Sequence, residues 1–131
     1  RSGTLLVVED DARVRRTIRD YLEAGEHDVL EARDGTDALQ AIRRHGGAID
    51  AVICDVMLPG ITGGGVARMI DAVCPGVPVL FVSGHPRDAL VRGGSVPEGA
   101  TVLQKPVGER RLLAEVSRLL KAAAKPPDPT P

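Results

Sequence analysis

Aromatic residues are nearly absent from this chain of 131 residues, which has only Tyr21 and Phe81. Proteins that bind single-stranded nucleic acid stack the bases on aromatic side chains, and two such residues are too few for that surface. No run of basic residues could follow a phosphate backbone, and 17 Lys and Arg against 18 Asp and Glu give a net charge of −1. We therefore expect no direct contact with nucleic acid.

Cysteine is scarce as well, since Cys54 and Cys74 are the only two. A secreted domain of this length that depends on disulfides usually has more, which favours a reducing, cytoplasmic location. No apolar stretch approaches the roughly 18 residues of a membrane-spanning helix, so no direct membrane contact is expected. The apolar share of 43% and the charged share of 27% are typical of a globular domain with one core.

Short aliphatic runs alternate along the chain with stretches of helical periodicity. Strands are expected at residues 4–8, 28–31, 51–54, 77–82 and 101–103, and helices at 12–24, 34–44, 65–73, 87–92 and 109–124. This alternation predicts an α/β fold in which a doubly wound parallel sheet has helices on both faces.

The domain limits follow from composition. The fourth helix is expected to be short and irregular, because glycine and proline recur between residues 86 and 100. Residues 4–122 are interpreted as a single domain. Residues 1–3 are interpreted as a linker or an expression remnant, and residues 123–131 as a proline-rich, disordered tail.

Polar residues follow the ends of four expected strands: Glu9 with Asp10, Asp55, Ser83 and Lys105. The carboxyl ends of parallel strands share one edge of a sheet, where doubly wound folds bind ligands, so these side chains are expected to meet. Three carboxylates there would repel one another unless a cation lay between them. Oxygen ligands suit Mg²⁺, with Mn²⁺ as an alternative, and the sequence has no Cys/His cluster for zinc.

This set of side chains suits phosphoryl transfer. Asp55 would be the nucleophile and form an aspartyl phosphate. Glu9 and Asp10 would hold the cation together with Asp55, while Ser83 and Lys105 would each bond a phosphate oxygen.

Four motifs resemble one known family. VVEDD at 7–11, CDVMLPGITG at 54–63, VSG at 82–84 and QKP at 104–106 are similar to the receiver domain of two-component response regulators. The resemblance covers residues 4–122 and implies the flavodoxin-like (βα)5 fold with strand order 2-1-3-4-5. It also implies a phosphorelay role, in which Asp55 takes a phosphoryl group from a histidine kinase or a histidine phosphotransfer protein.

The resemblance implies further roles. Met57 would offer its backbone carbonyl to the cation, and the Lys105–Pro106 peptide would be cis. Ser83 would move toward the phosphate as a switch residue, and Met57 and His85 would tune the access of water, with plain solvent exposure as the alternative for His85. Val102 stands where receivers often carry an aromatic switch residue, so the output is not expected to depend on an aromatic rotamer. Because Met57 is apolar, slow dephosphorylation is expected.

The segment 83–106 resembles receivers of hybrid sensor histidine kinases most. A stand-alone response regulator, a weak homodimer and a degenerate receiver that only binds proteins are the alternatives within the family. The isolated domain is expected to catalyse only its own phosphorylation and dephosphorylation. A haloacid dehalogenase-type phosphatase would need Asp in place of Met57, and a flavodoxin would need a hydroxyl-rich phosphate loop and aromatic residues around the flavin.

Several residues beside these motifs have simpler expected roles. Asp11 is expected to cap a helix, and Cys54 to be a buried strand residue. His27 and His45 are expected at the surface. Gly63–Gly65 is not a P-loop, because no Lys-Ser/Thr follows, and is expected to let the chain pass close to the site.

Overall fold

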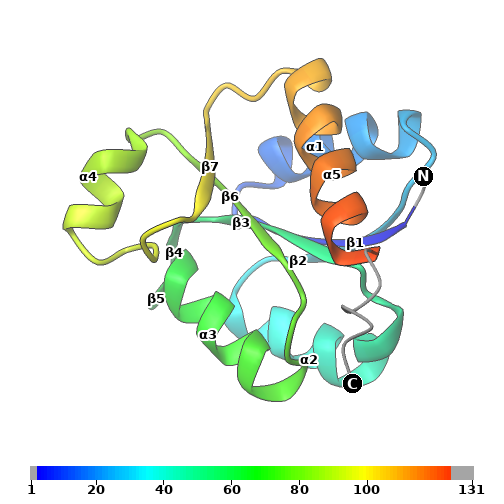
Figure 1. Cartoon of the computed structure of the whole chain (residues 1–131), viewed down its shortest axis with the longest axis horizontal. Helices are drawn as coiled ribbons and strands as arrows, with labels where there is room; N and C mark the ends of the chain where they lie inside the picture. The colour runs from blue at the N-terminus through cyan, green and yellow to red at the C-terminus, as the bar shows by residue number, and fades with distance from the viewer. Residues whose placement is uncertain (1–2, 125–131) are drawn as a thin grey trace, which may run out of the picture.

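The computed structural model describes residues 3–124 and contains a five-stranded parallel sheet (Figure 1). Its strands are β1 (Thr4–Val8), β2 (Asp28–Ala32), β3 (Ala51–Asp55), β6 (Val79–Ser83) and β7 (Thr101–Gln104). They lie in the order β2-β1-β3-β6-β7, and each neighbouring pair is parallel. Counted over these five strands, the order is 2-1-3-4-5, which confirms the predicted doubly wound, flavodoxin-like topology.

Helices cover both faces of the sheet. One face carries α1 (Ala12–Ala24) and α5 (Glu109–Ala124), and the other carries α2 (Gly35–His45) and α3 (Gly63–Val73), with α4 (Arg87–Arg92) beside β7 (Figure 1). Successive strand residues point to opposite faces, so Leu5 and Val7 pack with α1 and α5, while Leu6 and Val8 pack with α2 and α3. Burial on both faces explains why the three central strands, β1, β3 and β6, are nearly continuous apolar runs, whereas the edge strand β2 carries the exposed Asp28 and Glu31.

Side-chain caps set where α1, α2 and α3 begin, and at α2 the cap is Asp34, whose Oδ1 accepts the N–H of Asp37 at 2.8 Å. Asp11 Oδ1 accepts the N–H groups of Arg13 and Val14 at 2.8 and 3.2 Å, which confirms that Asp11 caps α1. Thr62 Oγ1 accepts the N–H of Gly65 at 3.1 Å, so α3 begins at Gly63, two residues earlier than predicted. Glycine has low helix propensity, and the cap at Thr62 outweighs it here.

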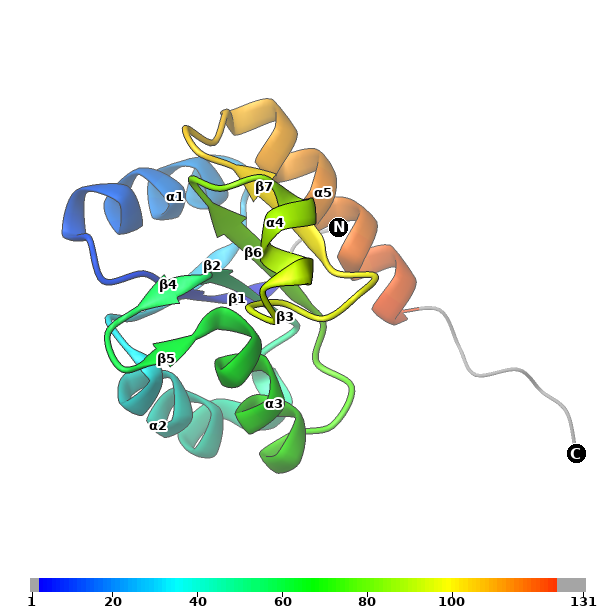
Figure 2. The same cartoon turned by 90° about the vertical axis from the view of Figure 1, so that its left-hand side faces the viewer.

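Three short elements add to the predicted set. Strands β4 (Met57–Leu58) and β5 (Ile61–Thr62) pair as an antiparallel hairpin between β3 and α3 (Figure 2). A 3₁₀ turn, η1 (Gly46–Ala48), follows α2. The hairpin was not predicted, because two-residue strands are too short to produce a recognisable pattern.

The fourth helix is short, as predicted. It ends at Arg92 with Gly93 as its C-cap, and Gly94 has a positive φ of 75°. The segment after it is nevertheless attached to the domain, since Val96 is buried and the Ser95 carbonyl accepts the N–H of Gly64 at 2.9 Å. None of the described helices has the length and hydropathy needed to cross a bilayer. Residues 123 and 124 of the expected tail 123–131 belong instead to the last turn of α5, and residues 125–131 lie outside the described residues.

The surface position expected for His27 is wrong. Its side chain is buried, and Nδ1 accepts the N–H of Gly3 at 3.1 Å. This contact brings together residues 24 positions apart, which local sequence patterns do not reveal. Burial lowers the pKa of His27 below its ordinary value.

This lowered pKa predicts a dependence of stability on pH. Between the folded pKa and the unfolded value of about 6.5, the unfolded chain binds more protons, so stability falls as pH decreases. We expect wild type to lose more stability between pH 7.5 and pH 5.5 than His27→Asn, whose Oδ1 takes the place of Nδ1 as a hydrogen-bond acceptor but does not titrate. Urea unfolding of both proteins at the two pH values measures this difference, and equal losses would contradict the assignment.

Candidate functional site

The polar residues that follow the strands meet at the carboxyl edge of the sheet. Lys105 Nζ donates to Glu9 Oε1 at 2.7 Å and lies 3.3 Å from Asp55 Oδ2. Glu9 and Asp55 are 1% and 6% exposed, and Ser83 at the end of β6 is fully buried. A lysine therefore bridges two buried carboxylates that are 46 positions apart in the chain, as the predicted topology requires.

Asp10 completes a cluster of three acids. One carboxylate oxygen from each of Glu9, Asp10 and Asp55 lies within 4.8 Å of the others, and only Asp10 is exposed. The pKa of Asp10 is raised by its side-chain hydrogen bond with Glu9, by burial and by the charge of Glu9. Close, hard oxygen donors with one side open to solvent fit a divalent cation such as Mg²⁺, which keeps several waters when bound.

Lys105 is held in its charged form. Burial alone would lower its pKa, but the hydrogen bond to Glu9 and the charges of Glu9 and Asp55 together raise it. The ammonium group thus offsets part of the negative charge of the cluster. It also lies where a group bound to Asp55 would meet it.

Backbone N–H groups orient side-chain oxygens of Glu9, Asp55 and Ser83. Asp55 Oδ1 accepts the N–H of Met57 at 3.2 Å, and Glu9 Oε2 accepts the N–H of Asp11 at 3.1 Å. Ser83 Oγ accepts the N–H of His85 at 3.0 Å. Among the described residues, no buried side-chain nitrogen or oxygen lacks a partner, so the site is held in place before any ligand binds.

Comparison with known proteins identifies the family. A family model for the response regulator receiver domain matches residues 5–117, which is most of the chain. The chain belongs to this family. It is a receiver domain of two-component phosphorelay signalling. Receiver domains accept phosphoryl groups from donors, bind Mg²⁺ at an acidic pocket, and interact with histidine kinases or phosphotransfer proteins.

Individual relatives differ in how much of their length the receiver occupies. Sensor kinase CckA of Brucella abortus is 32% identical over 120 residues, covering 92% of this chain but 13% of the kinase. Response regulator receiver protein CpdR of the same organism is 28% identical over 119 residues, covering 91% of this chain and 98% of CpdR. The crystal structure of the receiver domain from hybrid histidine kinase CckA is 34% identical, with a TM-score of 0.77, and the match covers 90% of this chain and 99% of that domain.

Three other residues were given roles by the family resemblance, and they lie on separate segments of the chain. Met57 begins β4 and is 57% exposed, and His85 is exposed just beyond Ser83. Val102 is partly buried in β7, in register with Phe81 of β6. The Lys105–Pro106 peptide is cis, as the family resemblance implied.

Cys54 is a buried residue of β3, as predicted. Its Sγ donates to the main-chain carbonyl of Asp55 at 3.2 Å. Burial, with the charges of Asp55 and Glu9, raises the pKa of the thiol far above its ordinary value. Cys54 is therefore an uncharged packing residue.

Two further residues support the site: Gly63, which belongs to the glycine run expected to pass close to it, and Arg15, which sequence reasoning missed. A Cβ atom on Gly63 would lie 2.9 Å from both the Asp55 carbonyl oxygen and Val56 Cα, so α3 can approach β3 this closely only with glycine there. Arg15 Nη1 donates to the Glu9 carbonyl at 2.8 Å. The glycine run gave a signal of close approach, whereas nothing in the sequence distinguishes Arg15 from the other arginines of α1.

Proposed function

We propose that Asp55 accepts a phosphoryl group from a phosphohistidine donor in a Mg²⁺-dependent reaction. The bridge that Lys105 makes between Glu9 and Asp55 is the observation that carries this assignment. An oxygen of the Asp55 carboxylate attacks phosphorus, the new P–O bond forms as the P–N bond breaks, and the imidazole nitrogen keeps the electron pair. The product is an aspartyl phosphate.

The other residues have separate roles in this proposal. Glu9, Asp10, Asp55 and the backbone carbonyl of Met57 would hold Mg²⁺. The ion would supply positive charge that stabilises the phosphoryl group during its transfer. Lys105 pairs with one phosphoryl oxygen, and the Ser83 hydroxyl donates to another.

The same proposal covers the protein context. The domain acts in the cytoplasm as part of, or partner to, a hybrid histidine kinase. The similarity to the CckA receiver supports the link to a hybrid kinase. The match to nearly all of CpdR supports the alternative of a stand-alone regulator, and a weak homodimer is compatible with either. The coding sequence that flanks the domain decides between the two contexts. Because Val102 is not aromatic, the signal passes through movement of Ser83 and the segment around α4.

Beryllofluoride, which mimics an aspartyl phosphate, tests the pocket by NMR. With Mg²⁺ present, we expect it to shift the amide signals of Asp55, Ser83 and Lys105 in wild type and to leave Asp55→Asn unchanged. Removing Mg²⁺ should abolish the shifts. A wild-type spectrum that does not change would favour a degenerate receiver that only binds proteins.

The exposed thioether of Met57 predicts a long-lived phosphoryl group. Met57 cannot accept a hydrogen bond strong enough to orient an attacking water. We expect Met57→Asn to shorten the phosphoryl half-life by roughly tenfold, because a polar amide can position water near phosphorus. The decay of phosphorylated protein, followed by intact mass, measures both half-lives. A wild-type half-life of only seconds would contradict the role given to Met57.

A further inference from the structure

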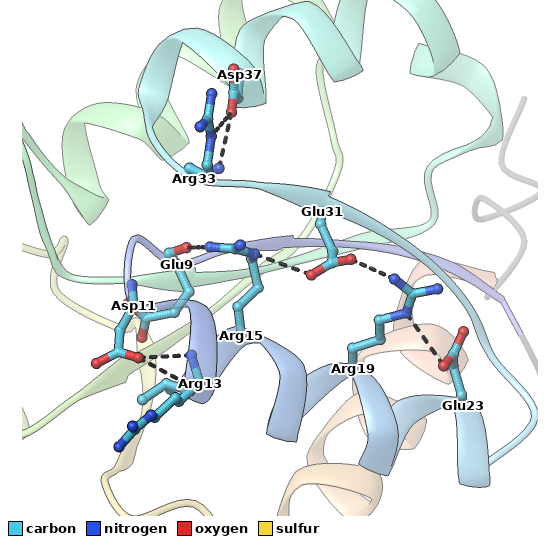
Figure 3. Close-up of polar contacts among 10 residues, drawn as sticks. Glu9, Asp11, Arg13, Arg15, Arg19, Glu23, Glu31, Arg33 and Asp37 are labelled. Atoms are coloured by element: carbon cyan, nitrogen blue, oxygen red, sulfur yellow. Dashed lines mark hydrogen bonds and ion pairs between the residues drawn. The ribbon is translucent and has the colours of Figure 1, made fainter.

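Arg15 connects the acidic cluster to the edge of the sheet (Figure 3). Its Nη1 donates to the main-chain carbonyl of Glu9 at 2.8 Å, and its Nε donates to Glu31 Oε1 of β2 at 3.1 Å. The side chain is only 15% exposed although it lies in the first turn of α1. One guanidinium group therefore fixes α1, β2 and the turn that carries Glu9 and Asp10.

The contact with Arg15 completes the hydrogen bonding of Glu9. The N–H of Glu9 donates to the Ala32 carbonyl at 3.0 Å, which holds one side of this peptide to β2. Its carboxylate accepts from Asp11 and Lys105, and its carbonyl accepts from Arg15. Loss of Arg15 would leave the carbonyl without this partner and free the turn after β1 to rotate.

The charge of Arg15 is neutralised by Glu31 of β2 and not by the three acids of the site. Glu31 pairs with both Arg15 and Arg19, and Arg19 also pairs with Glu23. Arg15 donates to the main chain of Glu9 and to Glu31, and so leaves the carboxylates of the cluster available to a cation. Arg15 is therefore suited to hold the turn without pairing with the carboxylates of the site, as Lys105 does.

We propose that Arg15 is a positioning residue for the cation site. It fixes the turn between β1 and α1, so that Glu9 and Asp10 face Asp55, and it touches neither the cation nor the phosphoryl group. This inference rests on the proposed function, because it concerns the Mg²⁺ that Glu9, Asp10 and Asp55 would hold.

The sign of the effect of Arg15→Met on Mg²⁺ affinity tests the proposal. If Arg15 acted only through its charge, removing it would tighten Mg²⁺ binding, because a positive charge near the site repels the cation. A positioning role predicts the opposite. We expect the dissociation constant for Mg²⁺, measured by NMR titration of backbone amides, to rise about tenfold, as is typical when a group that orients a metal ligand is lost.

Arg19→Met is the matched control. It removes the same charge from the same helix and the ion pairs with Glu31 and Glu23, but leaves the bond to the Glu9 carbonyl. Its Mg²⁺ affinity is expected to stay within about twofold of wild type, since exposed charges are screened. Equal or tighter binding by Arg15→Met than by Arg19→Met would overturn the proposal. If Arg15→Met does not fold, Arg15→Lys and Arg19→Lys replace the pair, because an ammonium cannot reproduce the planar fork of arginine.

Hydrogen exchange separates this inference from the proposed function. The amide of Asp11 donates to Glu9 Oε2, so its exchange without Mg²⁺ reports on the turn itself. We expect faster exchange at Asp11 in Arg15→Met than in Arg19→Met, and equal rates would refute the positioning role. A wild-type protein that binds no Mg²⁺ would instead contradict the proposed function, while the exchange comparison would still decide the role of Arg15.

Discussion

Lys105→Met is expected to lower the rate of Asp55 phosphorylation by about 100-fold and to destabilise the protein by about 2–3 kcal/mol without Mg²⁺. The rate falls because a fixed positive charge beside the phosphoryl oxygens is lost. Stability falls because the buried carboxylates of Glu9 and Asp55 lose the Lys105 ammonium group that pairs with both. The figure is below that for a fully buried pair because the Lys105 side chain is 26% exposed.

The rate of phosphoryl incorporation from acetyl phosphate and the urea unfolding midpoint measure the two effects. Lys121→Met is the matched control, since it removes the same charge from an exposed position on α5 and should change neither. Adding Mg²⁺ should stabilise Lys105→Met more than wild type, because the cation takes over part of the neutralisation of the acids. Wild-type phosphorylation by Lys105→Met would show that the ammonium has no part in the reaction.

Gly63→Ala is expected to destabilise the protein by about 1–3 kcal/mol and to slow phosphorylation as well. The added methyl group would lie 2.9 Å from the Asp55 carbonyl oxygen and 2.9 Å from Val56 Cα. Both are backbone atoms at the end of β3, so either α3 or the end of the strand must shift to remove the steric clash. The Gly63 N–H also donates to the Val56 carbonyl at 2.8 Å, which such a shift would weaken.

Gly65→Ala provides the control in the same helix. An added Cβ there would lie 2.7 Å from Ile61 Cγ1, so the Ile61 side chain would have to rotate, but the three nearest atoms are all side-chain atoms and no strand backbone has to shift. Since alanine favours helix by about 1 kcal/mol over glycine, we expect Gly65→Ala to lie within about 1 kcal/mol of wild type. Unfolding midpoints and phosphorylation rates of the two variants test this contrast. Equal stability of Gly63→Ala and wild type would mean that the close packing of α3 on β3 is unimportant.

Much of the fold followed from local patterns. The predicted bounds of α1, α4 and α5 agree with the structure, because the Asp11 cap, the glycines that follow α1 and α4, and the apolar stripe of α5 are all local features. The sheet order came from the family resemblance, since alternation of elements indicates a parallel sheet but not its order. The β4–β5 hairpin and the early start of α3 were missed, because two-residue strands and a glycine-rich first turn carry no clear periodicity.

The site was predictable as far as it depends on strand ends. Glu9, Asp55 and Lys105 meet because they follow β1, β3 and β7, which parallel topology brings to one edge. The contacts of Arg15 and His27 were not predictable, since each depends on the path of a side chain to a distant main-chain group.

The site of phosphorylation tests the central claim most directly. The protein is incubated with acetyl phosphate and Mg²⁺, and mass spectrometry of the intact chain and its peptides locates the added group. We predict one phosphoryl group, on the peptide that contains Asp55, and none on Asp55→Asn or without Mg²⁺. No adduct on wild type, or an undiminished adduct on Asp55→Asn, would contradict the assignment of Asp55 as the phosphoacceptor.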